Sequence, residues 1–226
     1  MTWSAFIRML DREIAWDHPT PEQNLRIETA LRDVFADKSA IINRCHQVVN
    51  SDALFHLYKA HLNYPSKIMD VFVLYLDPVD RFSVRLHRFR GLKQKVGVAS
   101  KLHSHDWGYS TLGLKGSYRE MIYRVNSIDE RAGTAALTLH AERVLTPGCT
   151  QSGYVEQAHI LYGNDDPDDC VTLFVRGTPQ RVGFRKYNLE AGTYKQQKDS
   201  FDSVEDVPDH ILKQCYLRLG ELDTDF

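Results

Sequence analysis

The sequence predicts a mainly β domain, built as a barrel or a sandwich, with helices packed outside it. Residues 68–188 divide into many short runs of strand-forming residues separated by turn signals, which is the spacing of sandwiches and barrels. Residues 20–62 instead repeat apolar residues at the period of a helix. Strands and helices do not alternate along the chain, which argues against a parallel α/β sheet. With 226 residues, the chain is long enough to bury one sizeable core.

Residues 1–67 are predicted to form a helical extension ahead of the barrel. Thr20, with Gln23 three residues later, forms a capping box, and Pro21 occupies the first helical position. A second helix start is expected at Ser51. The buried stripe expected after Thr20 consists of Leu25, Ala30, Leu31, Val34 and Phe35, extended by Ile41 and Ile42.

Residues 68–188 are predicted to form the β-barrel itself. Nine strands are expected, at residues 67–76, 81–89, 99–107, 109–116, 117–125, 135–145, 153–162, 170–177 and 181–189. Residues 189–226 are polar and acidic. We expect them to form a C-terminal tail with one short helix after Pro208.

Composition and charge limit the partners and the location. A formal net charge of −2 argues against nucleic acid or an anionic membrane as the main partner. No apolar run approaches the roughly 18–20 residues that span a bilayer, and the charged N-terminal segment is a poor signal peptide. The four cysteines include no Cys-x-x-Cys pair, which favours a reduced, cytoplasmic setting. The sequence leaves open whether the chain forms a homodimer.

Two histidines lie one residue apart in the segment KLHSHDWGY, residues 101–109. Because side chains alternate across a strand, His103 and His105 point to the same face, together with Trp107, Tyr109 and Thr111 if the strand stays regular. On an inward face, two imidazoles about 6–7 Å apart at the backbone can bind one metal ion. The alternative is a pair of structural histidines, each with its own hydrogen-bond partner.

The surrounding pattern resembles the first motif of the cupin superfamily. Gly97, His103, His105, Tyr109 and Gly116 follow the form G-x5-H-x-H-x3-Y-x6-G, and cupins usually have Glu at the position of Tyr109. This resemblance implies a double-stranded β-helix, or jelly-roll, barrel.

A looser resemblance to the second cupin motif lies in the segment GYVEQAHILYGN, residues 153–164. It supplies a lone His159, with Asn164 one residue later than the usual Asn, and Tyr154-Val155-Glu156 stands in the place of the usual Pro-x-Gly. Together the two motifs imply that His103, His105 and His159 hold one metal ion inside the barrel.

A neutral set of three histidines resembles the site of thiol dioxygenases of the cysteine dioxygenase type. That resemblance implies Fe(II), with Ni, Mn or Zn as alternatives, and an oxygenase that uses dioxygen and a small anionic metabolite, an amino acid or a thiol such as cysteine. The chain departs from this family, because Thr172, Phe174 and Arg176 stand where those enzymes carry a Ser-His-Tyr set. Apolar VFVLYL also stands where their carboxylate-binding Arg lies. We therefore expect a relative with a changed substrate or outcome.

Two strands supply candidates for substrate binding. On residues 81–89, either Val84 and Leu86 or Arg85 and His87 face inward. If this strand aligns with its thiol dioxygenase counterpart, the second pair faces the metal, and Arg85 is a bidentate clamp for a substrate carboxylate. Arg176 is the other candidate clamp, since it shares a strand face with Thr172 and Phe174.

Tyr109 is the candidate catalytic residue. It is expected either to steer oxygen delivery or to fill the barrel interior. Two other functions stay open for a cupin with this pattern: a redox-neutral, metal-dependent isomerase or lyase, and a non-catalytic domain that binds a small molecule.

Overall fold

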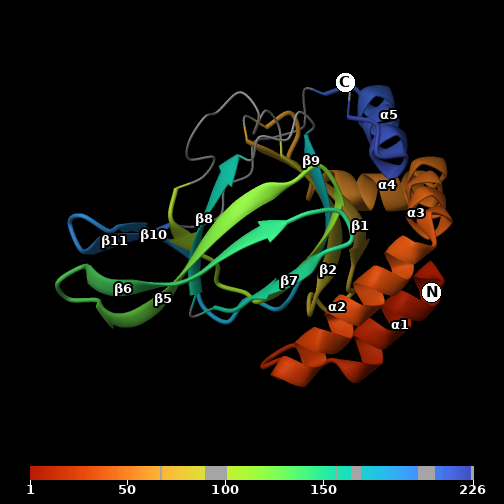
Figure 1. Cartoon of the computed structure of the whole chain (residues 1–226). Helices are drawn as coiled ribbons and strands as arrows, with labels where there is room; N and C mark the ends of the chain where they lie inside the picture. The colour runs from red at the N-terminus through yellow and green to blue at the C-terminus, as the bar shows by residue number, and fades with distance from the viewer. Residues whose placement is uncertain (67, 90–100, 156, 164–168, 198–206, 225–226) are drawn as a thin grey trace.

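The computed structural model describes residues 1–66, 68–89, 101–155, 157–163, 169–197 and 207–224. Within these ranges the chain forms eleven strands in two sheets, with five helices outside them (Figure 1). This arrangement confirms the predicted mainly β, cupin-like barrel with N-terminal helices outside it. Gly97, Glu156 and Asn164 of the two sequence motifs lie outside the described residues.

The first sheet is antiparallel and has its strands in the order β1-β2-β9-β4-β7. The antiparallel pairing of β2 with β9 joins segments that are far apart in the sequence, and it places His87 directly opposite Thr172. The strands are β1 (Met69–Leu76), β2 (Ser83–Phe89), β9 (Cys170–Arg176), β4 (Tyr109–Lys115) and β7 (Thr150–Gly153).

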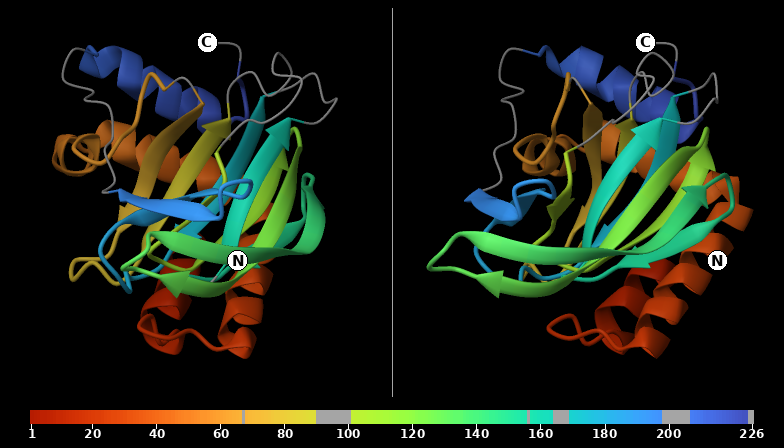
Figure 2. Two further views of the ribbon diagram at one scale, coloured as in Figure 1. Left: turned by 90° about the vertical axis from the view of Figure 1, so that its left-hand side faces the viewer. Right: turned by 60° about the vertical axis from the view of Figure 1, so that its left-hand side comes forward.

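The second sheet closes on itself in the order β10-β11-β6-β5-β8-β3. Its longest part is the β5–β6 hairpin, which extends beyond the neighbouring strands (Figure 2). Its strands are β10 (Phe184–Asn188), β11 (Thr193–Gln197), β6 (Thr134–Leu145), β5 (Tyr118–Asp129), β8 (Gln157–Gly163) and β3 (His103–Ser104).

The helices cover the outer face of the first sheet (Figure 1). Apolar side chains from this face, among them Val84, Leu86 and Leu173, form one core cluster with the buried faces of the helices. Tyr216 ties the C-terminal helix to the sheet, because its hydroxyl donates to the carbonyl of Val73 at 2.8 Å. The helices are α1 (Trp3–Glu13), α2 (Pro21–Ala36), α3 (Lys38–Asn50), α4 (Asp52–Lys59) and α5 (Asp209–Gly220).

The predicted helix starts are confirmed, and one predicted core residue is wrong. Thr20 and Gln23 form the reciprocal capping box of α2, and the Ser51 side chain caps α4. Leu25 is 59% exposed, whereas Ile27 is buried. At about 100° per residue, two positions separate these side chains by roughly 200°, so Ile27 lies on the buried face and Leu25 opposite it.

The strands differ from the prediction at three places. Residues 99 and 100 of the predicted strand over residues 99–107 lie outside the described residues. The described part is a strand only at His103–Ser104, because the chain there leaves the second sheet and enters the first at Tyr109. The short strand β7 was not expected. Nor was β11, which lies inside the segment predicted as a tail and pairs with β10. The helix expected after Pro208 is α5.

The conformation of the turn between β4 and β5 explains why the last position of the first motif, Gly116, is a glycine. Gly116 has φ +62°, and a Cβ there would lie 2.7 Å from the carbonyl oxygen of Asp169. Only glycine adopts this left-handed conformation without strain and leaves that space free. Among the described residues, no helix is long and apolar enough to cross a membrane.

Candidate metal centre

Three histidines come together where the two sheets approach each other. His103 on β3 and His159 on β8 are direct partners across neighbouring strands, and His105 is the residue directly after β3. One ligand nitrogen from each ring can be chosen so that all three lie within 4.8 Å of one another. The structure therefore brings together the three residues that the sequence motifs indicated.

The separations between the nitrogens fit a shared metal ion. Nε2 of His159 lies 3.0 Å from Nε2 of His105 and 3.2 Å from Nε2 of His103. Metal–nitrogen bonds of about 2.0–2.1 Å place two ligand nitrogens about 2.9 Å apart at a right angle and about 3.4 Å apart at a tetrahedral angle. Both of these separations fall between the limits, so His159 can share one ion through Nε2 with each of the other two rings, and the ligand nitrogens of all three lie within 4.8 Å of one another.

The hydrogen bonds of two rings fix the tautomer that a metal requires. Nδ1 of His103 lies 2.7 Å from the carbonyl oxygen of Lys101, and Nδ1 of His159 contacts the carboxylate of Glu120. Since a carbonyl and a carboxylate only accept, each Nδ1 carries the proton. The lone pairs of both rings are then on Nε2 and point at one another, an arrangement that a cation between them stabilises.

Burial keeps the rings of His103 and His105 neutral. It lowers the pKa of His103 to about 3, helped by the neighbouring His159. Burial also lowers the pKa of His105 well below its ordinary value, with further contributions from His103 and His159. Neutral imidazole is the form that binds metal, so this environment suits a divalent ion.

Glu120 on β5 is the site residue that the sequence reasoning missed. Its side chain is buried, and its Oε1 accepts hydrogen bonds from Nδ1 of His159 and, at 3.0 Å, from the hydroxyl of Tyr109. Burial raises the pKa of Glu120, but the bonds from His159 and Tyr109 lower it more, so the carboxylate stays charged. The signal available in the sequence was a glutamate at a position that strand alternation can place on the inward face.

Tyr109 lies behind His159 rather than beside the ligand nitrogens. Its hydroxyl is 3.1 Å from Nδ1 of His159, the nitrogen that faces away from the metal position. Burial and the charge of Glu120 raise the pKa of Tyr109 well above its ordinary value, so the phenol keeps its proton and donates. Gly153 makes room for the ring, because a Cβ there would lie 2.2 Å from Cε1 of Tyr109.

A cavity of about 420 Å³ extends from the three histidines between the sheets. Arg85, His87, Tyr109 and Arg176 all line it, so of the two faces that the sequence left open on β2, the one with Arg85 and His87 faces inward. Val84 and Leu86 pack outward against the helices. The roles of the four cavity-lining residues in substrate binding and catalysis stay predictions, but the structure places their side chains on one cavity.

Aromatic rings form the cavity wall next to the metal position. Trp107 stacks on His105 with ring centroids 3.9 Å apart, and Tyr109 stacks on Phe174 at 5.1 Å. The guanidinium of Arg176 lies over the Trp107 ring at 5.4 Å. Rigid rings of this kind hold the ligand histidine in place and leave the arginine charge facing the cavity.

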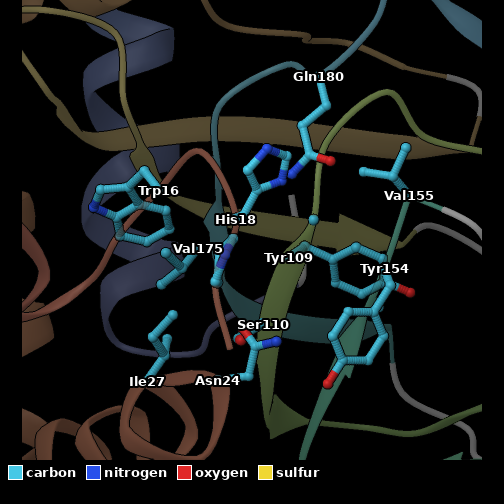
Figure 3. Close-up of a pocket in the computed structure, with 13 residues that line it drawn as sticks. Trp16, His18, Asn24, Ile27, Tyr109, Ser110, Tyr154, Val155, Val175 and Gln180 are labelled. Carbon is cyan, nitrogen blue, oxygen red and sulfur yellow. The ribbon is translucent and has the colours of Figure 1, made fainter. Parts of the chain in front are cut away.

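A smaller hollow of about 130 Å³ lies on the other side of Tyr109, between the helical segment and the barrel. Figure 3 shows its side chains, with Trp16 and Ile27 on one side and Tyr109 and Tyr154 on the other. Trp16 is held by a hydrogen bond from its Nε1 to the carbonyl of Leu10 at 2.8 Å. This hollow belongs to the junction between helices and barrel, and Tyr109 is shared by both cavities.

No family model matches the sequence, and no curated protein matches it either. Solved structures with a similar fold include hydroquinone 1,2-dioxygenase PnpCD in complex with Cd²⁺ and 4-hydroxybenzonitrile (13% identity, 50% of this chain and 67% of that chain, TM-score 0.37). An RmlC-like cupin protein from Ralstonia eutropha is 13% identical over 68% of this chain and 80% of its own, with TM-score 0.38. Hydroxypropylphosphonic acid epoxidase from S. wedmorenis is 8% identical over 51% of this chain and 53% of its own, with TM-score 0.36. The function proposed below therefore rests on the site of this chain.

Proposed function

We propose that the protein is a metal-dependent oxygenase that acts on a small anionic metabolite, an amino acid or a thiol-bearing carboxylate such as cysteine. The observation that carries the proposal is the three Nε2 atoms of His103, His105 and His159, which converge on one point of a cavity that two arginines also line. Fe(II) is the favoured metal, with Ni, Mn or Zn as alternatives.

Three neutral ligands determine which partners the site favours. Histidines leave the full double charge on a divalent ion and leave coordination positions open. Of the described carboxylates, Glu120 contacts a ligand ring, and it does so at Nδ1 rather than at the metal position. Fe(II) bound there would bind and activate dioxygen, and the substrate that is oxidised would supply the electrons that reduce it. An anionic, chelating substrate compensates the charge that a ligand carboxylate would otherwise supply.

Arg85 and Arg176 are the proposed carboxylate-binding residues. Arg85 is buried and its Nε donates to the Ser83 hydroxyl at 2.9 Å, which fixes the direction of the guanidinium. Arg176 is fixed over Trp107. A carboxylate bound by either guanidinium gains charge-assisted hydrogen bonds and is oriented toward the histidines.

Glu120 and Tyr109 are the proposed positioning residues for His159. The carboxylate accepts the Nδ1 proton of His159, and the Tyr109 hydroxyl donates to the same oxygen. Such a partner fixes the ring and raises the basicity of Nε2. The role of Tyr109 in steering oxygen delivery stays a prediction.

Oxygen consumption tests the proposed function. Protein loaded anaerobically with Fe(II) is mixed with a panel of amino acids and thiol carboxylates, and oxygen uptake and product mass are recorded. We expect uptake with one group of related substrates and a product heavier by the oxygen atoms incorporated. Zn(II)-loaded protein and a His159→Ala variant are the controls, and both should be inactive.

Two outcomes would contradict the oxygenase proposal. Conversion of a panel compound without oxygen uptake would favour a redox-neutral isomerase or lyase. Tight binding of one compound without any conversion, measured by calorimetry on the same metal-loaded protein, would favour a binding domain.

Variants of the two arginines test the carboxylate clamp. Arg85→Gln and Arg176→Gln keep a long polar side chain but remove the charge. Loss of one charge-assisted contact to a carboxylate, about 1.5–3 kcal/mol, corresponds to a roughly 10- to 150-fold rise in KM or Kd. Unchanged affinity in both variants would contradict the clamp.

A further inference from the structure

Among the described side chains that line the cavity, three have a buried polar atom without a hydrogen-bond partner: Nε2 of His87, Oγ1 of Thr172 and Nε1 of Trp107. Trp107 stacks on His105 next to the metal position, whereas His87 and Thr172 form a separate pair. His87 is 4% exposed and Thr172 is 1% exposed, and both line the cavity that contains the three histidines. They are direct partners on the neighbouring strands β2 and β9, so the two unpaired groups share one side of the cavity wall.

An unpaired buried polar group lowers the stability of the folded protein, so its presence in a cavity indicates a ligand that pairs with it. Such a group has lost its hydrogen bonds to water, and that loss is uncompensated until a partner meets it. Burial, and to a smaller extent Arg85, lowers the pKa of His87 to about 3, so its imidazole is neutral near pH 7. A neutral imidazole and a hydroxyl can each donate or accept. A hydroxyl or carbonyl group of a ligand therefore fits this pair.

The pair lies away from the residues proposed to bind the carboxylate. Across the sheet, Arg176 is in register with Tyr109, Phe174 with Arg85, and Thr172 with His87. Residues two apart on a strand are separated by about 6.6–6.8 Å. Thr172 therefore lies about 13 Å along its strand from Arg176, and His87 about 7 Å along its strand from Arg85.

The cavity around the pair is large and mainly apolar. Met69, Val71, Phe89 and Leu161 line it. Its volume of about 420 Å³ falls in the range of roughly 300–1,000 Å³ that is typical of small-molecule sites. On β9, the ring of Phe174 lies between Thr172 and Arg176 and lines the same cavity, so an apolar side chain separates the pair from that arginine, which suits a substrate with an apolar middle.

We propose that His87 and Thr172 bind a second polar group of the substrate, a hydroxyl or carbonyl separated from the carboxylate by an apolar body. The substrate class is then a carboxylate with a polar group at its far end, larger than cysteine. This inference rests on the proposed function, because it assumes that the carboxylate end binds near the metal and the arginines.

Calorimetry on the full-length, Zn(II)-loaded protein tests the inference without any turnover. The probes are straight-chain carboxylates from butanoate to octanoate and their ω-hydroxy counterparts. At one chain length we expect the hydroxyl to lower Kd about fivefold, the worth of one net hydrogen bond of about 1 kcal/mol. Thr172→Val and His87→Phe should each remove this preference.

Thr111→Val is the matched control. Thr111 lines the same cavity on β4, but its hydroxyl already donates to the carbonyl of Leu173 at 3.3 Å. The hydroxyl preference should therefore persist in this variant.

Thermal unfolding of the ligand-free protein gives a second readout. Thr172→Val removes an unpaired hydroxyl, so the melting temperature should rise by about 2–4 °C. Thr111→Val removes a paired hydroxyl and should lower it. A structural role for the Thr172 hydroxyl would give a lower melting temperature in both variants.

Two outcomes overturn the inference, and they are distinguishable. If the simple carboxylates bind but no ω-hydroxyl improves binding at any length, the role of His87 and Thr172 is wrong and the proposed function stands. If none of the carboxylates binds to the metal-loaded protein, the anionic substrate of the proposed function is wrong as well.

Discussion

The two faces of the first sheet are both buried, but they are built differently. On β2, Val84 and Leu86 pack outward against the helices, whereas Arg85 and His87 face the cavity between the sheets. The outer face is mainly apolar and continuous with the main core, and its buried charges, Arg88 and Asp70, are paired with each other. The inner face has charged and polar groups, two of which are unpaired among the described side chains, namely His87 Nε2 and Thr172 Oγ1.

This difference separates stability from function on a single strand. The outer face contributes burial of apolar surface, the main favourable term in folding. The inner face keeps polar groups in a buried place at a cost in stability, which is the pattern expected where a ligand must be bound. Substitutions on the two faces should therefore have effects of different kinds.

The largest effect is expected at the ligands. His159→Ala removes one of the three proposed metal ligands, so metal affinity should fall by roughly 100-fold or more. Loss of a residue that only hydrogen-bonds to a ligand typically costs about 10- to 100-fold. Metal content after dialysis, measured by elemental analysis, checks this. His140→Ala, at an exposed position on β6, is the control and should keep full metal content. Undiminished metal in both His159→Ala and His103→Ala would refute the site.

On the outer face, the loss should be in stability alone. Leu86→Ala leaves a cavity in the core beneath the helices and should lower the free energy of unfolding by about 2–5 kcal/mol. Metal content per folded chain should not change. Leu25→Ala, at an exposed position, should change stability by less than about 0.5 kcal/mol. Denaturant unfolding measures both variants, and a parallel loss of metal in Leu86→Ala would contradict the separation of the two faces.

A Glu120 variant tests the role of a residue that contacts a proposed ligand histidine rather than the metal position. Glu120→Gln keeps the shape of the side chain but removes the charge that accepts the Nδ1 proton of His159. Metal affinity should fall about 10- to 100-fold, less than for loss of a ligand. Competition with a chelator measures it. Glu142→Gln, whose carboxylate is about half exposed, is the matched control, and an equal effect in both variants would speak against a role for Glu120.

The smallest effect concerns the pH dependence of the metal-free protein. The pKa of His87 is about 3 in the folded state and about 6.5 in an unfolded chain. The unfolded state therefore binds more protons below pH 6.5, and stability falls as the pH falls. Between pH 7 and 5.5 this residue should account for about 1.3 kcal/mol of the loss. His87→Phe should remove that part, as measured by denaturant unfolding at both pH values. If the free energy of unfolding changes with pH equally in the variant and the unmodified protein, His87 is not buried as a neutral ring.

Local signals determined much of the fold and two of the three proposed metal ligands. The capping box at Thr20 and Gln23 and the turn at Gly116 act through neighbouring residues, so the sequence predicts them directly. The spacing of His103 and His105 puts two ligands on one face, because strand alternation is a local property. His159 was placed by its resemblance to a motif rather than by any local rule.

Tertiary structure decided which face of each strand is inside and which distant residues meet. Alternation on β2 gives two faces but does not say which one points inward, since packing of the helices against Val84 and Leu86 makes that choice. Glu120 reaches His159 across 39 residues of sequence through the pairing of β5 with β8. Such pairings depend on sheet order and register. No local pattern encodes that order, and so the sequence alone showed the ligands but not the carboxylate that orients one of them.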